Sequence, residues 1–197
     1  MSRQVPLNYQ RMGQVAWEKM PKVNAELFAL TYGSMVSQVI KDYEKVDAIN
    51  EQLEKMGHNI GIRLIDEFLA KSGADMSAPC GSLRETADLI TKVAFRMFLN
   101  MNADTTNWNS EATVFSIVFN DSPITEFVEL PPHLQGLKYC NVFCGIIRGA
   151  LSMVQLEVDV EIIRDILKGD ENNELKVTYK ARGKAGDGLM DEYDEGN

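Results

Sequence analysis

The 197-residue chain is poor in the residues that build disulfide frameworks, metal centres and membrane spans. It has three cysteines and two histidines, and no apolar run reaches the roughly 18 residues needed to cross a bilayer. An odd number of cysteines without a secretory signal region predicts a reducing compartment and free thiols. Cys140 and Cys144 lie four apart, but no further Cys or His completes a zinc site, so no metal is expected.

Positive charge is also scarce. The chain has 20 Lys and Arg against 29 Asp and Glu, which gives a formal net charge of -9 and a pI of about 4.8. Nucleic-acid binding needs a basic face, so this balance argues against nucleic acid as a partner. A membrane surface stays possible, because local charge can differ from the total. The length and the 45% hydrophobic content suit one globular domain with its own core.

The chain divides into three parts by composition. Residues 1–23 are weakly patterned and are expected to form an arm that is mobile or lies on a partner. Residues 24–182 carry the regular patterns of a folded domain. Residues 183–197 are glycine-rich and acidic, and they cannot bury enough apolar area to fold alone. This tail is predicted to be disordered, either solvating the protein or ordering on a partner.

Four amphipathic helices are predicted, over about 24–44, 47–71, 82–101 and 137–155, from apolar residues that recur at steps of three and four. Two of them contain glycine pairs at a four-residue spacing. Gly57 and Gly61 each cost about 1 kcal/mol relative to alanine, which favours close helix packing or a weak kink. Gly145 and Gly149 resemble a membrane-helix pattern, but Arg148 and the short length favour a buried helix of a soluble protein.

Three segments have the pattern of strands. Residues 114–119 are β-branched and aromatic and predict a buried strand, whereas 105–109 are turn-like. Residues 156–162 and 175–181 alternate apolar with charged side chains, acidic in the first and basic in the second. We expect these two strands to pair antiparallel, with the charged rows attracting each other. The fold class is therefore α+β, with four to five helices packed on a small antiparallel sheet.

The candidate site lies around the start of the third helix. Ser82 and Glu85 form a capping box, which fixes the helix start. Cys80 precedes the cap by two residues, where the helix dipole can favour a thiolate; the alternative is an inert loop cysteine. Behind the cap, Ala87 and Ala94 are small residues in a stripe of large ones. They indicate either close approach of a neighbouring element or room for a ligand.

Several runs in one order resemble a known family: residues 26–33, 56–65, 84–88, 127–131, 148–154 and 167–170. Over roughly residues 24–180, the chain resembles subunit 3 of the transport protein particle (TRAPP) vesicle-tethering complex. The resemblance implies an α+β fold with an internal apolar channel and a homodimer or heterodimer through the helices over 24–44 and 47–71. It also implies other TRAPP subunits as partners, and ER-to-Golgi transport at the cytoplasmic surface of the endoplasmic reticulum and cis-Golgi. Nucleotide exchange on a Rab-type GTPase is then a property of the assembled complex, and the subunit itself is not an enzyme.

The same resemblance implies a covalent lipid. Family members carry a fatty acyl group, typically palmitoyl, on a cysteine just before the third helix, and Cys80 stands at that position. Ala94 stands where the family keeps a small residue along the acyl channel, and Ala87 is predicted to line the channel with it. A palmitoyl chain buried in this way contributes on the order of 10 kcal/mol, at ~0.8 kcal/mol per methylene. It would then be part of the core, with the membrane contacted only peripherally.

Two other functions are considered. A soluble lipid-binding module would take an apolar ligand reversibly and leave the Cys80 thiol free. A cysteine-dependent acyl-transfer enzyme would need a base close to its nucleophile. Because His58 and His133 lie in no recognisable motif, the sequence argues against this enzyme.

Overall fold

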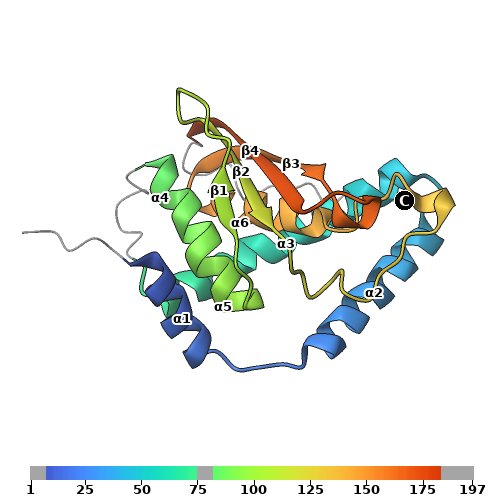
Figure 1. Ribbon diagram of the computed structural model, residues 1–197, viewed down its shortest axis with the longest axis horizontal. Helices are drawn as coiled ribbons and strands as arrows, with labels where there is room; N and C mark the ends of the chain where they lie inside the picture. Colours follow the sequence, from blue (N-terminus) through green and yellow to red (C-terminus); the bar gives the residue numbers. More distant parts are fainter. Residues whose placement is uncertain (1–7, 75–81, 183–197) are drawn as a thin grey trace, which may run out of the picture.

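The computed structural model describes residues 8–74 and 82–182. Cys80 and the acidic tail from residue 183 therefore lie outside the described residues. Figure 1 shows the order of the helices and strands along the chain. The elements are α1 (Tyr9–Lys19), α2 (Ala25–Asp42), α3 (Val46–Ser72), α4 (Leu83–Asp88), the π-helical η1 (Leu89–Ala94), α5 (Phe95–Leu99), β1 (Asp104–Thr106), β2 (Val114–Phe119), the 3-10 turn η2 (Pro132–Leu134), α6 (Asn141–Met153), β3 (Leu156–Arg164), the 3-10 turn η3 (Ile166–Lys168) and β4 (Asn173–Arg182).

The helix ends follow the capping residues that the sequence provides. The Asn24 side chain accepts a hydrogen bond from the Leu27 amide at 2.8 Å and starts α2 as predicted. The Ser82 hydroxyl accepts from the Glu85 amide at 3.2 Å and starts α4. Helix α3 ends at Gly73, whose φ of 75° is a left-handed conformation that glycine adopts without a steric penalty.

The predicted helix over 82–101 is one continuous rod, but its middle is not α-helical. Residues Leu89–Ala94 form a π-helical segment between α4 and α5. Leu89 and Ala94 are five apart, the spacing joined by a π-helical hydrogen bond, and both face the cavity described below. The helix ends at Asn100, which has a φ of 55°. The sequence stripe predicted the rod but not this change of turn, because the pattern of apolar residues fits both helix types over so short a stretch.

The four strands form one antiparallel sheet in the order β1-β2-β4-β3. Strands β3 and β4 pair as predicted, and their charged rows form ion pairs: Lys176 with Glu161 at 2.8 Å and Lys180 with Asp159 at 2.6 Å. The edge strand β1 lies in the segment that was expected to be a turn. Its three residues pair with β2, the next strand along the chain, so the strand is formed by this pairing and not by a pattern of its own.

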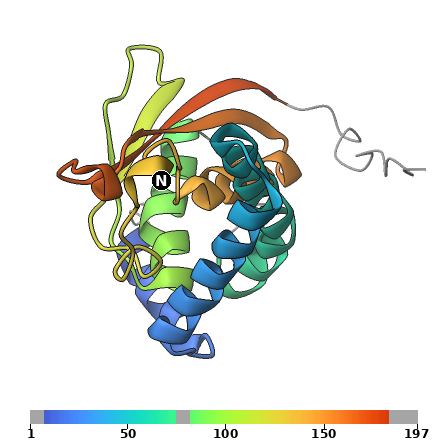
Figure 2. The ribbon, with the colours of Figure 1, turned by 90° about the vertical axis from the view of Figure 1, so that its right-hand side faces the viewer.

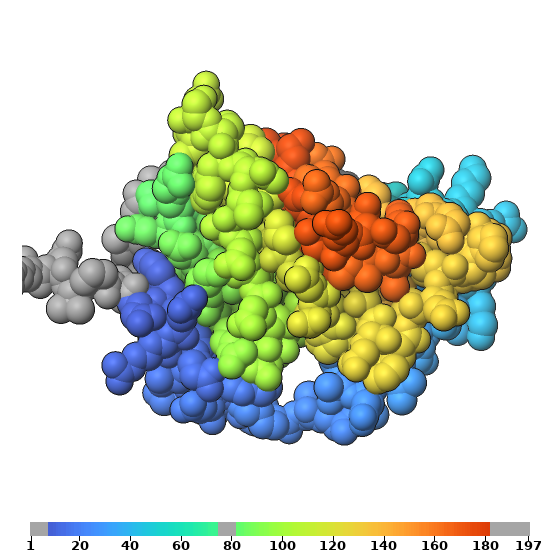
Figure 3. Space-filling view, in the orientation of Figure 1, coloured from blue at the N-terminus to red at the C-terminus, as the bar shows by residue number. Residues whose placement is uncertain are grey.

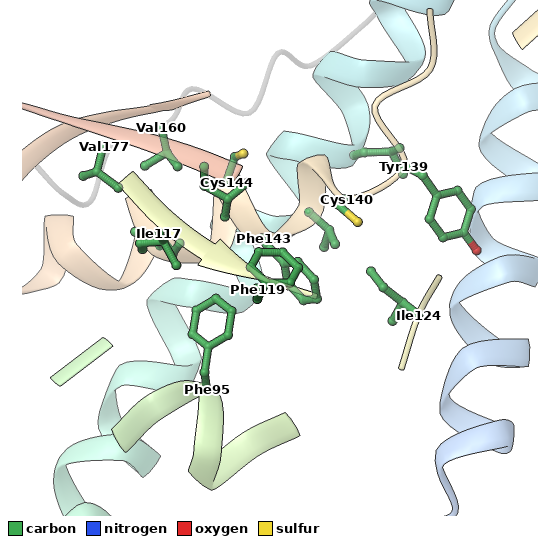
Figure 4. Packing of buried hydrophobic residues seen from close by; sticks show 14 of the residues in the cluster. Phe95, Ile117, Phe119, Ile124, Tyr139, Cys140, Phe143, Cys144, Val160 and Val177 are labelled. Carbon is green, nitrogen blue, oxygen red and sulfur yellow. The ribbon is translucent and has the colours of Figure 1, made fainter. Parts of the chain in front are cut away.

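The main core lies between the sheet and α6. Three phenylalanines from different elements meet there: Phe95 of α5, Phe119 of β2 and Phe143 of α6 (Figure 4). Their ring centroids are 5.6 to 6.2 Å apart, in tilted and edge-to-face arrangements that aromatic pairs prefer. Helix α6 therefore has one side on the sheet and leaves its other side for α3.

Helices α3 and α6 pack closely through four glycines. A Cβ atom at any of the four would overlap a backbone carbonyl oxygen of the opposite helix. The pairs are Gly57 with Val142, Gly61 with Ile146, Gly145 with Glu54, and Gly149 with His58. Because α3 is unbroken from Val46 to Ser72, close packing is confirmed as the reason for the glycines in preference to a kink.

The first helix differs from the mobile or partner-bound arm expected for residues 1–23. Residues Tyr9–Lys19 form α1, with the Asn8 side chain as its N-cap. Gly13 lies against the carbonyl oxygen of Lys92, and Gln14 accepts hydrogen bonds from the Arg96 guanidinium at 2.7 and 3.0 Å. Ala16 is also buried in a second core cluster, against which Tyr9 and Met12 pack, so α1 docks through a narrow apolar face together with a polar contact.

Helix α2 stands apart from the sheet. Figure 2 shows α2 and α3 on one side of the helical layer and α4 to α5 on the other. One tie to the body is the Tyr32 hydroxyl, which donates to the Tyr139 carbonyl at 2.7 Å, with the two rings edge to face at 5.2 Å. The space between these two groups of helices contains the candidate site.

Candidate functional site

An apolar cavity of about 400 Å³ lies between the helices. This volume falls within the roughly 300–1,000 Å³ of small-molecule sites. Every lining residue within the described ranges is apolar or a hydroxyl-bearing Thr or Tyr. The described lining consists of Phe28, Thr31, Tyr32 and Met35 of α2; Met56, Ile60, Leu64, Ile65 and Phe68 of α3; Thr86, Leu89, Ile90, Ala94, Phe95, Phe98 and Leu99 of the α4–α5 rod; Ile124; Val142, Phe143, Ile146, Ile147, Ala150 and Leu151 of α6; and Val154, the C-cap of α6.

Each of the three hydroxyl groups in the described lining donates a hydrogen bond to a backbone carbonyl oxygen. Thr31 donates to Leu27 at 2.7 Å, Tyr32 to Tyr139 at 2.7 Å, and Thr86 to Ser82 at 3.3 Å. Burial, together with the neighbouring Cys140 and Tyr139, raises the pKa of Tyr32 far above its usual range, so this group stays neutral. The cavity therefore suits a hydrocarbon chain better than a polar ligand.

The described part of the lining has no charged or metal-ligating side chain. None of the described lining residues is His, Cys, Asp, Glu, Lys or Arg. Across residues 8–74 and 82–182, no three His, Cys, Asp or Glu side chains are placed to hold a metal ion. Over the same ranges, no helix is long and apolar enough to cross a bilayer. What the described part of the cavity can do is enclose an apolar chain.

The predicted site residues lie in different places. Ala94 lines the cavity, where its small side chain leaves the volume open between α3, α6 and the rod. Ala87 is fully buried in the main core and is not among the described lining residues. Cys80 lies outside the described residues, so its acylation stays a prediction, as do the channel roles of both alanines.

Periodicity recognised most lining residues as helix stripes, and the family resemblance implied an internal apolar channel, but the stripe residues were not assigned to it. Ile124, from the loop after β2, had no helical pattern to mark it, yet it joins the lining and is 1% exposed. A stripe shows that a face is buried but does not tell whether side chains or a ligand cover it. Only the spacing of α2, α3, α6 and the rod shows that the stripes leave a cavity.

The two described cysteines have no role in the cavity lining. Cys140 and Cys144 are buried free thiols near the start of α6 (Figure 4). Burial raises the pKa of Cys144 to about 12 and raises that of Cys140 well above its usual range. The thiolate is the reactive form, so both groups are expected to be unreactive in the folded protein.

Alkylation tests this expectation. Iodoacetamide at pH 8 should leave Cys140 and Cys144 unmodified in the native protein, because their pKa values lie far above the pH of the reaction. Both should react in urea, where the thiols return to an ordinary pKa. Peptide mapping by mass spectrometry measures each site separately. Native labelling of Cys144 would mean that the start of α6 opens readily.

The fold and cavity together define a class: an α+β domain whose helical layer encloses an apolar cavity above a four-stranded antiparallel sheet. Residues 28–178 match the family described as transport protein particle (TRAPP) component. This chain belongs to that family.

The chain is also similar to individual proteins whose names place them in this family. The chain is 46% identical over 173 residues to the trafficking protein particle complex subunit 3 of Dictyostelium discoideum, covering 87% of this chain and 91% of the relative. It is 48% identical over 173 residues to the transport protein particle subunit bet3 of Schizosaccharomyces pombe, covering 86% and 91%. A crystal structure of the subunit 3 from Naegleria fowleri, covalently bound to palmitic acid, is 50% identical with a TM-score of 0.79, covering 83% of this chain and 99% of that one.

Proposed function

We propose that this chain is a non-enzymatic core subunit of a TRAPP vesicle-tethering complex in ER-to-Golgi transport, with a palmitoyl chain on Cys80 buried in the apolar cavity. The observation that carries the proposal is the cavity itself, which has no charged lining residue among those described. Support comes from the Naegleria relative of similar fold, which is covalently bound to palmitic acid.

Chain connectivity is consistent with Cys80 as the attachment point. Cys80 is two residues before Ser82, the N-cap of α4, and Thr86, one turn into that helix, already lines the cavity. Leu89 and Ala94 continue the lining along the π-helical segment. An acyl chain attached before α4 would therefore have an apolar path beside the rod, between α3 and α6. Ala94 is the residue on this path whose enlargement would narrow the cavity most directly.

The acyl chain would act as part of the core. At ~0.8 kcal/mol per buried methylene, its burial contributes on the order of 10 kcal/mol, more than a marginally stable domain can lose without consequence. A chain buried inside the protein is not available to anchor it in a bilayer. Membrane contact would then be peripheral and made by the assembled complex.

Assembly would use the apolar surface of α2 and α3. Leu27 and Leu30 of α2 are exposed and are not among the described lining residues of the cavity. Exposed apolar groups of this size, close together, mark interaction sites. We assign this surface to dimer formation with a second TRAPP-type subunit. Other subunits, and a Rab-type GTPase whose nucleotide exchange the assembled complex catalyses, would complete the particle at the cytoplasmic face of the endoplasmic reticulum and cis-Golgi.

The proposal is tested by the intact mass of protein purified from its own cells, before and after neutral hydroxylamine. We expect a mass increment of one palmitoyl group, removed by hydroxylamine, on the peptide that contains Cys80. A Cys80→Ser variant should lack the increment, whereas a Cys144→Ser variant should keep it. An unmodified mass with a titratable Cys80 thiol would contradict the acylation.

Reversible lipid binding is a second candidate function. Three lining residues, Phe28, Met35 and Ile60, are 39%, 41% and 41% exposed, so the cavity has an opening through which a ligand can exchange. This function predicts a lipid that organic solvent extracts without hydroxylamine, and it predicts that Cys80→Ser protein retains the same lipid. Mass spectrometry of the extract separates the two functions.

A further inference from the structure

Helix α2 is anchored to the body at its C-terminal half and is free at its first turn. Val36 and Val39 are buried in the main core. The Tyr32 hydroxyl and ring are held by Tyr139, as described above. Residues 21–28, in contrast, are all exposed. The first turn of α2 therefore has few contacts of its own that fix its position, and the helix can pivot about its anchored half.

Helix α1 is docked at the other end of the cavity. Figure 1 shows α1 beside α5 and α2 on the far side of the molecule, joined by a single segment that crosses between them. Ala16 of α1 is buried in a cluster with Ile65 and Phe68 of α3 and with Val93 and Met97 of the rod. Ile65 and Phe68 also line the cavity. Helix α1 thus supports a cavity wall from outside, and its position is fixed relative to α3 and the rod.

The segment that joins the two helices is short, extended and fastened to α1. It consists of residues 20–24 and begins with Met20 in an extended conformation, which the following Pro21 favours. Five residues span at most roughly 18 Å. The Lys22 ammonium donates to the carbonyl oxygens of Trp17 and Met20 and lies over the Trp17 ring at 3.7 Å. The start of α2 is therefore held close to the end of α1.

The opening of the cavity lies along this segment. Phe28 is an exposed lining residue only four positions after Asn24, about 6 Å along the helix. The space-filling view shows an opening bounded by α2 and the segment before it on one side, and by α5 and the loop after β2 on the other (Figure 3). The position of the first turn of α2 therefore sets the width of this opening.

We propose that α1 and residues 20–24 form a strap that holds the first turn of α2 against the body, and that release of α1 from the rod opens the apolar cavity for ligand exchange. With α1 docked, the short segment fixes the place of Phe28. With α1 released, α2 pivots about its anchored half and the opening widens. The inference goes beyond the proposed function, because it concerns the entrance of the cavity and needs no acyl group on the protein.

Helix α1 is well suited to reversible release. Its 11 residues are fewer than an isolated helix needs to be stable in water, so it depends on the rod. Beside its apolar contact lies a polar cavity of about 410 Å³, whose lining includes Gln10 and Gln14 of α1 and Lys92 and Arg96 of the rod. This cavity is large and polar enough to hold water, so release exposes little new apolar surface. Such elements open at a lower free energy than the whole domain.

Hydrogen exchange of the Gly13→Leu protein, measured by mass spectrometry, tests the strap. A side chain at this position would overlap the Lys92 carbonyl oxygen, so α1 must move away from the rod, although leucine itself favours a helix. We expect the amides of residues 28–31 to exchange at least tenfold faster than in the wild type, and those of β2 and β4 to be unchanged. Val15→Leu places the same side chain at an exposed position of α1 and is the matched control.

Equal exchange of residues 28–31 in the Gly13→Leu and wild-type proteins would overturn the proposal. The same increase in β2 and β4 would also overturn it, because the effect would then be a loss of global stability. A second variant inserts six Gly and Ser residues after Lys22, which keeps α1 docked and lengthens only the connection. It should accelerate exchange of residues 28–31 as Gly13→Leu does. No effect of the insertion would show that α1 does not act as a strap.

The release of a free fatty acid tests the opening itself. The probe is cis-parinaric acid, a fluorescent 18-carbon fatty acid, bound to Cys80→Ser protein so that no covalent group competes for the cavity. We expect Gly13→Leu to raise its dissociation rate at least fivefold in stopped-flow measurements. An unchanged rate, with faster exchange in α2, would show that α2 moves but does not control the entrance, which overturns the inference.

The outcomes also separate this inference from the proposed function. An unmodified Cys80 in protein from its own cells contradicts the acylation, but it changes neither the exchange of residues 28–31 nor the release of the probe. Failure of the Cys80→Ser protein to bind the fatty acid would contradict both a lipid site and an entrance to it. Wild-type exchange rates in both strap variants would overturn the strap alone.

Discussion

Removal of the acyl chain proposed on Cys80 is expected to lower the melting temperature of the protein by about 10 °C or more. A cavity of about 400 Å³ between α2, α3, α6 and the rod would be left without its apolar contents. The transfer value of ~0.8 kcal/mol per methylene sets an upper limit on the order of 10 kcal/mol. Two effects reduce this upper limit. The lining residues can collapse into the empty cavity, and the acyl chain already contacts apolar residues in the unfolded protein. Each kcal/mol that remains corresponds to about 2–4 °C for a chain of this length.

Differential scanning calorimetry before and after hydroxylamine measures the shift. The Cys80→Ser protein, treated in the same way, is the control and should melt at the same temperature with and without the reagent. An Ala94→Leu variant should hold less acyl chain and show a smaller shift, because the larger side chain narrows the cavity. If the acylated and deacylated proteins melt together, the acyl chain does not lie in the cavity.

The second large effect is expected at the interface of α3 and α6. Gly57→Ala should cost about 3 kcal/mol or more of unfolding free energy, although alanine gains about 1 kcal/mol in helix propensity. The reason is geometric: the new Cβ would overlap the carbonyl oxygen of Val142, and a backbone atom cannot turn aside as a side chain does. The two helices must separate, which also disturbs the cavity lining that they share. Gly145→Ala, facing the Glu54 carbonyl, should behave in the same way.

Urea unfolding of the two variants and of a matched control measures these costs. Gly33→Ala in α2 is the control, because its Cβ would meet only the Tyr139 hydroxyl at 3.4 Å, an ordinary contact. This substitution should be neutral or slightly stabilising. A Gly57→Ala protein as stable as the wild type would mean that α3 and α6 can separate without loss of packing elsewhere.

The sequence by itself determined most of the local structure. Asn24 and Ser82 mark helix starts because their side chains cap backbone amides of the next turn, and such contacts need no distant partner. The alternating charges of β3 and β4 predicted both the pairing of these strands and the ion pairs between them. Gly57 and Gly61 predicted close helix packing or a weak kink, because glycine is costly in a helix interior, and the contact with α6 decided between the two.

The tertiary structure decided what depends on distant segments. Helix α1 is docked because Gly13 and Gln14 meet the rod at Lys92 and Arg96, about 80 residues further along the chain. Ala87 and Ala94 belong to one stripe in the sequence but lie in different places in the structure. Ala87, before the π-helical segment, is in the core, and Ala94, at its end, lines the cavity. The sequence alone determined which faces are apolar, because periodicity is a local property. Only the packing of four helices, set by side-chain volumes far apart in the chain, decided that these faces enclose a cavity.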